Sequence, residues 1–157
     1  AAQEFNGRVI APNGIRTIEG GILSYGGDFG REHNPFTIGL GRLVDVDQDI
    51  DFIGKQALKK IKEKGPSEKL VGLELEGEPI LKAPENFWPV NNKDKKVGRL
   101  SRAFFSPRLK KNIGLAIVDI DFAGEGTEVS VESPNGDLLS KVVSLPWYTA
   151  DKETHLD

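Results

Sequence analysis

Residues 70–76 read Leu-Val-Gly-Leu-Glu-Leu-Glu, and Gly77 follows them. Apolar residues recur at every second position through most of this stretch, which is the pattern of a strand with one face on a core and the other in water. The sequence before residue 66 lacks this period of two. The chain therefore changes its structural class near Gly65-Pro66, from helical and irregular structure to strands.

The sequence after residue 77 continues in short strands. A hairpin is expected where 89–90 and 97–101 flank Asn-Asn-Lys-Asp at 91–94, and residues 113–120 form an almost unbroken apolar run typical of a core strand. Residues 126–132 alternate again, Pro-Asn-Gly-Asp at 134–137 makes a turn, and 138–145 returns. About six short strands separated by such turns favour a small antiparallel barrel or sandwich.

The first 65 residues predict two helices. Residues 15–23 carry apolar side chains at helical spacing, interrupted by Gly20-Gly21, and a short strand is expected at 8–11. Residues 49–64 predict a longer helix that begins at Asp51 as its N-cap and ends at Gly65-Pro66. Its apolar face is formed by Ile53, Ala57, Leu58 and Ile61. The fold class is therefore α+β.

Composition excludes several kinds of site. The 157 residues contain no cysteine, so disulfides and thiolate chemistry are excluded, and the two histidines, His33 and His155, are too far apart to predict a metal site. A net charge of −3 gives no reason to expect nucleic acid or an anionic membrane as a partner. No signal peptide or membrane span is visible, which predicts a cytoplasmic protein. Methionine is absent even at position 1. An initiator methionine removed before Ala1 would explain this, but together with the family resemblance described below we expect an internal start, as in a proteolytic fragment, a deliberately shortened chain or a split gene product.

Several short motifs, in order, resemble the family of folate-dependent aminomethyltransferases. In the first half they are Glu-Gly-Gly at 19–21, Ser-Tyr-Gly-Gly-Asp at 24–28, Asn-Pro-Phe at 34–36, Gly-Leu-Gly at 39–41 and Asp-Phe-Ile-Gly-Lys-Gln-Ala-Leu at 51–58. In the second half they are Val-Gly at 97–98, Ser-Pro at 106–107, Lys-Asn-Ile-Gly-Leu-Ala at 111–116, Gly-Thr at 126–127 and the segment 142–147. No single motif is decisive, but together they cover the chain almost end to end.

The resemblance implies an architecture and a cofactor. Residues 1–65 would be the C-terminal part of a mixed α/β, folate-binding central domain (strand, helix, linker, helix). Residues 66–150 would form a C-terminal antiparallel β-barrel domain of about six strands, and 151–157 a polar tail. The cofactor would be tetrahydrofolate, bound mainly by residues upstream of this chain. The partners would be a small-molecule methyl donor, the folate and the missing N-terminal portion of the same protein, without nucleic acid, membrane or metal. No catalytic residue is expected here, so the isolated chain is expected to be inactive.

Two kinds of enzyme within this family are alternative interpretations of the sequence. The glycine-cleavage T-protein usually carries an arginine six residues before the glutamate that matches Glu19, and this sequence has Asn13 there, after Pro12. That pair, with Gly-Glu-Pro-Ile at 77–80 and Trp-Pro at 88–89, is more similar to dimethylsulfoniopropionate (DMSP) demethylases, which form 5-methyltetrahydrofolate. The interpretation favoured by these residues is a DMSP demethylase. The alternatives are an aminomethyltransferase or a dimethylglycine- or sarcosine-metabolising relative, and, in another class, a non-catalytic barrel module that docks on a separate folate-binding half.

The candidate cofactor-binding residues are Glu19, Tyr25, Arg102, Phe104 and Arg108. Each has a structural alternative. Glu19 could bond backbone amides at a domain junction, and Tyr25 could fill the seam between domains instead of stacking on a folate ring. Phe104 could fill the barrel core, with Arg102 and Arg108 solvated, instead of forming an aromatic and cationic wall for the glutamate tail of the folate.

Overall fold

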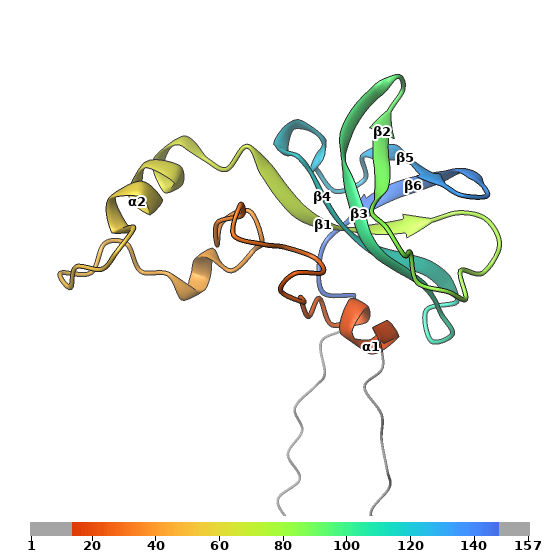
Figure 1. Ribbon diagram of the computed structural model, residues 1–157, viewed down its shortest axis with the longest axis horizontal. Helices are drawn as coiled ribbons and strands as arrows, with labels where there is room; N and C mark the ends of the chain where they lie inside the picture. Colours follow the sequence, from red (N-terminus) through yellow and green to blue (C-terminus); the bar gives the residue numbers. More distant parts are fainter. Residues whose placement is uncertain (1–13, 148–157) are drawn as a thin grey trace, which may run out of the picture.

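The computed structural model describes residues 14–147, in which six antiparallel strands form a closed barrel (Figure 1). The strands are β1 (Glu68–Leu75), β2 (Trp88–Asn92), β3 (Lys95–Ser106), β4 (Lys111–Asp119), β5 (Glu128–Ser133) and β6 (Gly136–Val143). Around the barrel their order is β1-β4-β3-β2-β5-β6. The predicted six-stranded antiparallel barrel is confirmed.

The register of β1 explains its alternating sequence. Val71, Leu73 and Leu75 point into the barrel, where they pack with side chains from every other strand. Gly72 points outward, and a Cβ on it would lie 2.8 Å from the ring of Trp147, so only glycine permits this close contact. The predicted hairpin joins β2 to β3 through Lys93, which has a positive φ of 53°.

A second, smaller cluster lies on the outside of the barrel. Helix α1 (Gly14–Glu19) packs on β3 and β4, and its Ile18 is buried with Ile113 and Leu115 of β4. The helix predicted for 15–23 is thus present but shorter. It ends where the backbone of Gly21 turns to a positive φ of 63°, which lies outside the helical region.

Residues 41–64, which we call the arm, project away from the barrel (Figure 1). They contain a 3-10 turn, η2 (Gly41–Leu43), and helix α2 (Lys55–Lys64). The prediction that this helix begins after Asp51 is wrong. Gly54 is its N-cap in a left-handed conformation with φ of 90°, and no side chain caps it. Because Ile53 therefore lies before the helix, it is fully exposed instead of joining the apolar face.

Other predictions fall outside the described range or concern the membrane. The strand expected at 8–11 and the tail at 151–157 lie outside residues 14–147. Among the described residues, no helix has the length and apolar character needed to cross a bilayer. Another 3-10 turn, η3 (Ile120–Phe122), follows β4.

Candidate functional site

Only some of the candidate residues predicted from the sequence lie close together. Glu19, Arg102 and Phe104 meet on the outer face of β3 and β4, where residues 14–33 cross the barrel. Tyr25 lies at the surface beside this seam, and Arg108 is exposed in the turn between β3 and β4. The structure therefore unites three of the five candidates at one junction.

Arg102 is the centre of that junction. Its Nε donates to Oδ1 of Asp28 at 2.8 Å and its Nη2 to Oδ2 at 2.6 Å, which makes a two-pronged ion pair. Nη1 donates to the Thr17 hydroxyl at 3.0 Å and Nη2 also to the Ile22 carbonyl at 2.8 Å. All three guanidinium nitrogens thus bind protein groups from the N-terminal segment, and the role of Arg102 in folate binding stays a prediction.

Asp28 is the acidic partner of Arg102 in this ion pair. Its side chain is fully buried, and its carboxylate accepts two further hydrogen bonds, from the Ser24 amide at 2.7 Å and from the Ser101 hydroxyl at 2.7 Å. The bond to Ser24 is a local contact that closes the turn of residues 24–28. The pairing with Arg102, 74 residues away, was not predicted.

Glu19 is buried at the end of α1. Its Oε1 accepts a hydrogen bond of 2.6 Å from the Ser106 hydroxyl, which in turn accepts one from the Leu109 amide. The Glu19 carbonyl accepts a 2.9 Å bond from the amide of Trp147. Glu19 therefore joins α1 to the end of β3 and to the segment after β6. Its contact with a folate stays a prediction.

Phe104 lies outside the barrel. It packs against the Ile18, Ile113 and Leu115 cluster beneath α1, so the alternative that it fills the barrel core is wrong. The reason is the bulge between Leu100 and Arg102, because the extra residue shifts the register of β3 against β4 beyond it. Arg108 remains exposed and takes part in contacts of its own.

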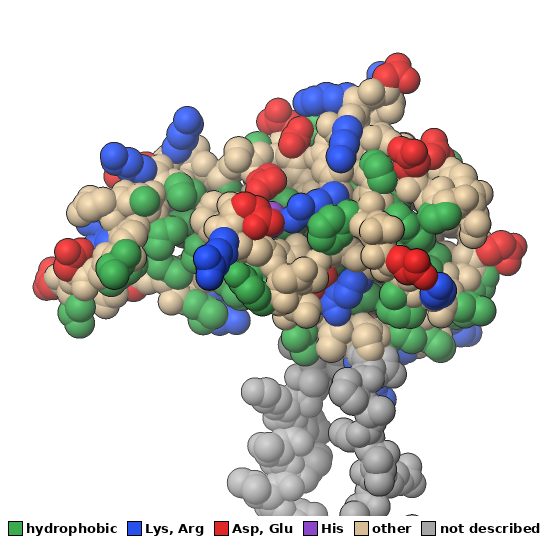
Figure 2. Space-filling model, in the orientation of Figure 1, with side chains coloured by type: hydrophobic (Ala, Val, Ile, Leu, Met, Phe, Trp, Pro, Cys, Tyr) green, Lys and Arg blue, Asp and Glu red, His purple; other side chains and the backbone are tan. Residues whose placement is uncertain are grey.

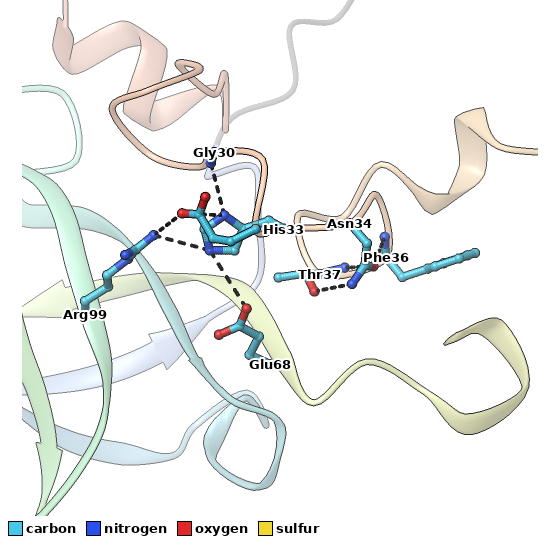
Figure 3. A network of polar contacts seen from close by, with 8 residues as sticks. Gly30, His33, Asn34, Phe36, Thr37, Glu68 and Arg99 are labelled. Carbon is cyan, nitrogen blue, oxygen red and sulfur yellow. Dashed lines mark hydrogen bonds and ion pairs between the residues drawn. The ribbon is translucent and has the colours of Figure 1, made fainter. Parts of the chain in front are cut away.

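A second polar network is centred on His33 (Figure 3). The imidazole is buried: the Gly30 amide donates to Nδ1 at 3.0 Å, and Arg99 Nη2 lies 3.2 Å from Nε2. Glu68 of β1 is 3.8 Å from Nε2 and Glu32 is 3.2 Å from Nδ1. His33 was not predicted to matter, because a lone histidine in a sequence shows none of these partners.

Glu32 is the most perturbed acid of this network. The pKa of its carboxyl is held below the ordinary value by a backbone hydrogen bond, then by Arg99, whose Nη2 lies 3.3 Å from Oε1, and by the charge of His33. The carboxylate is therefore fixed in its charged form beside Arg99, which it partly neutralises.

Tyr25 borders a shallow cavity of about 410 Å³. Its ring is 65% exposed and meets Phe29 edge to face, with ring centres 5.6 Å apart. Arg99 and Phe87 also line this cavity; the guanidinium of Arg99 lies 4.5 Å above the ring of Phe87, which is 46% exposed. At this cavity a sequence-predicted candidate, Tyr25, faces open space together with further aromatic and cationic groups.

Metal chemistry has no visible support in the described part of the chain. No group of three or more histidine, aspartate or glutamate side chains within residues 14–147 is arranged to hold an ion. The arrangement can bind a ligand, position it and shield it from water. Its two buried carboxylates, Asp28 and Glu19, are already bonded to protein donors.

Comparisons with known proteins agree with the fold. Residues 68–149 match the glycine cleavage T-protein C-terminal barrel domain. An aminomethyltransferase from Bacillus pumilus is 39% identical over 135 residues, and one from Bacillus velezensis is 36% identical over 157. The crystal structure of the glycine cleavage system aminomethyltransferase T from Bartonella henselae superposes with a TM-score of 0.73 at 25% identity over 83% of this chain.

The chain corresponds to only part of each of these proteins. It covers 36% of the Bacillus pumilus protein, 42% of the Bacillus velezensis protein and 36% of the Bartonella chain. The alignments cover 86% of this chain for the Bacillus pumilus protein and 98% for the Bacillus velezensis protein. The chain therefore belongs to the glycine cleavage T-protein family, of which it carries the C-terminal barrel domain.

Proposed function

We propose that this chain is the C-terminal part of a tetrahydrofolate-dependent one-carbon transferase. In this proposal residues 1–65 complete a folate-binding central domain and residues 66–150 form the barrel domain behind it. The observation that carries the proposal is the likeness to aminomethyltransferases across 86% of this chain but only 36% of the relative. Such coverage leaves room for a larger upstream portion of the same protein.

The arm supports a larger assembly. Within residues 14–147, α2 makes no substantial contact with any barrel strand, and its apolar residues Leu58 and Ile61 are only half-buried. Leu43, Ile50 and Ile53 on the same arm are 63%, 71% and 102% exposed. Figure 2 shows hydrophobic side chains gathered on this projecting part of the molecule. An upstream portion that covers them would remove an apolar patch from water.

The described residues also fit a supporting role. Tetrahydrofolate, when bound, supplies the nitrogen that takes up the one-carbon unit. Glu19 and Asp28 are each engaged by protein donors, so neither is free to transfer a proton. What this chain offers is a rigid junction, in which Arg102 fixes residues 17–28 to the barrel. The cavity beside Tyr25, with its aromatic and arginine lining, is the surface here that fits part of a folate.

The one-carbon donor has two candidates. Names of the relatives favour an aminomethyl donor, as in the glycine cleavage system, over the DMSP demethylase interpretation. The demethylase remains a second candidate because Asn13 stands where T-proteins usually carry arginine, and because of the motifs at 77–80 and 88–89. A non-catalytic barrel module that docks on a separate folate-binding half is the candidate of another class.

The test is reconstitution. The upstream portion encoded with this chain would be expressed separately, mixed with the 157-residue chain, and assayed with tetrahydrofolate and either DMSP or an aminomethyl carrier. We expect folate-dependent turnover only in the mixture. Asn13→Arg distinguishes the two donors, because it restores the arginine that T-proteins usually carry at this position. Stable association without turnover on either donor would support the non-catalytic module, and turnover by the isolated chain would contradict the proposal.

A further inference from the structure

The side chain of His33 is 3% exposed, and each of its two ring nitrogens lies near both a hydrogen-bond donor and an acceptor (Figure 3). Nδ1 lies 3.0 Å from the amide nitrogen of Gly30 and 3.2 Å from Oε1 of Glu32. Nε2 lies 3.2 Å from Nη2 of Arg99 and 3.8 Å from Oε1 of Glu68. A ring nitrogen donates when it carries a hydrogen and accepts when it does not. Each nitrogen can therefore bond only one of its two neighbours at a time.

The neutral ring bonds Gly30. The amide of this residue is a permanent donor, and a backbone amide shielded from water needs an acceptor. Arg99 depends less on the ring, because its Nη2 also lies 3.3 Å from Oε1 of Glu32 and its guanidinium lies over the ring of Phe87. Nδ1 is therefore the acceptor in the neutral form, and the hydrogen is on Nε2, which faces Glu68.

The charged groups around the ring act on its proton in opposite directions. Glu32 and Glu68 favour an imidazolium, and Arg99 opposes it. The pKa of Glu32 is held below its ordinary value, first by a backbone hydrogen bond, so this carboxylate stays charged. Two negative charges and one positive charge leave the cluster at −1 around a neutral ring, and one proton makes it neutral.

Protonation changes the partner of Nδ1 without a large movement. An N–H group at Nδ1 cannot accept from Gly30, but Oε1 of Glu32 already lies 3.2 Å away. The Glu32 carboxylate also covers Gly30, since a Cβ built on this glycine would lie 2.5 Å from Oε2. A separate bond of 3.2 Å, from the His33 amide to the Gly30 carbonyl, keeps the turn closed in either form.

We propose that His33 is a proton-operated switch in the segment of residues 14–33 that crosses the barrel. In the neutral form Nδ1 accepts from Gly30, and the hydrogen on Nε2 faces Glu68. Uptake of one proton from water forms an N–H bond at Nδ1 and releases the Gly30 amide to solvent. The ring then lies between the carboxylates of Glu32 and Glu68. All of these partners belong to residues 14–147, so the switch requires neither the upstream portion nor a folate.

The switch confines a pH-dependent change to one turn of the segment. Asp28, in the same segment, keeps its two-pronged ion pair with Arg102, and neither residue contacts the ring through a bond described above. The partners that change belong to residues 30–33, to β1 and to β3. The response to a proton is therefore expected at the turn of residues 30–33 and not at the Arg102 junction.

NMR on the 157-residue chain with isotope-labelled histidine and glycine tests the switch. At about pH 8 the ring nitrogens of His33 should show a hydrogen on Nε2 alone, and at about pH 5 on both nitrogens. Over the same change, hydrogen exchange at the Gly30 amide should accelerate roughly two- to tenfold relative to the Gly27 amide, which donates to the Ser24 carbonyl. This ratio removes the general effect of pH on exchange. His33→Gln distinguishes the ring signals from those of His155.

Two acidic residues of β1 give a matched pair of variants. Glu68→Gln removes a charge 3.8 Å from Nε2, so the exchange of partners should move to lower pH by about one unit. Glu74→Gln removes the same charge from a carboxylate that pairs with Lys111, and it should leave the midpoint unchanged. Arg99→Gln should move the midpoint to higher pH, because it removes a positive charge 3.2 Å from Nε2.

Several results would overturn the proposal. One is a His33 ring that stays neutral down to about pH 5, or that carries its neutral hydrogen on Nδ1. Another is a Gly30 exchange ratio that stays constant while the ring takes up its proton. Equal effects of Glu68→Gln and Glu74→Gln would do the same. The ring and amide measurements need only the unaltered chain, so they decide the question even if a variant does not fold.

Discussion

Replacement of Arg102 by methionine tests whether this residue holds the N-terminal segment on the barrel. Arg102→Met keeps an unbranched side chain on β3 but removes four hydrogen bonds, two of them to the fully buried carboxylate of Asp28. Breaking a buried ion pair costs about 3–5 kcal/mol when one charge is left alone. Here the Arg102 side chain is 21% exposed and Asp28 keeps its bonds to Ser24 and Ser101, so we expect a loss of about 2–4 kcal/mol.

Urea denaturation followed by tryptophan fluorescence measures this loss. Lys111→Met is the matched control, because it breaks a 2.6 Å ion pair to Glu74 in which the lysine is 54% exposed, and it should cost less than about 1 kcal/mol. A double-mutant cycle with Asp28→Asn isolates the pairwise energy. If Arg102→Met costs no more than the control, the junction is not held by this contact and the reasoning fails.

Two further predictions concern the barrel wall and the arm. Gly72→Ala should destabilise the barrel by about 1–3 kcal/mol in thermal unfolding, because its Cβ would lie 2.8 Å from the Trp147 ring; Gly124→Ala, with no atom nearer than 3.4 Å, should be close to neutral. The pKa of Asp47 is held below its ordinary value by a hydrogen bond from Lys62, so the contact stabilises the arm above the unfolded pKa and is lost as the pH falls through the folded one. Lys62→Gln should raise the Asp47 pKa in a carboxyl NMR titration, and an unchanged value would contradict the pairing.

The strands could be predicted because their signals are local. The turn at 91–94 and the apolar run at 113–120 specify β2, β3 and β4 within a few residues, and the alternation at 70–76 marks β1. The start of α2 was mispredicted because a local signal pointed to the wrong residue. Asp51 is a good local cap, but the left-handed Gly54 three residues later sets the beginning of the helix.

The junction could be predicted only as a set of candidates. Glu19 and Arg102 were singled out from their neighbours in sequence, but their partners Ser106 and Asp28 lie 87 and 74 residues away. No spacing rule links such positions, because the fold alone brings them together. His33 was passed over because its partners Glu68 on β1 and Arg99 on β3 are also remote in the chain, Arg99 by 66 residues.

The bond between the Glu19 carbonyl and the Trp147 amide brings the first helix and the last described residue to the same pole of the molecule (Figure 1). A linker between the segment before α1 and the segment after β6 would close the chain, with new termini opened at the exposed Lys93–Asp94 turn. A circular permutant of this kind should keep the barrel intact. Another protein could then be fused at the Lys93–Asp94 turn, at a distance from the end of the molecule where α1 and Trp147 lie.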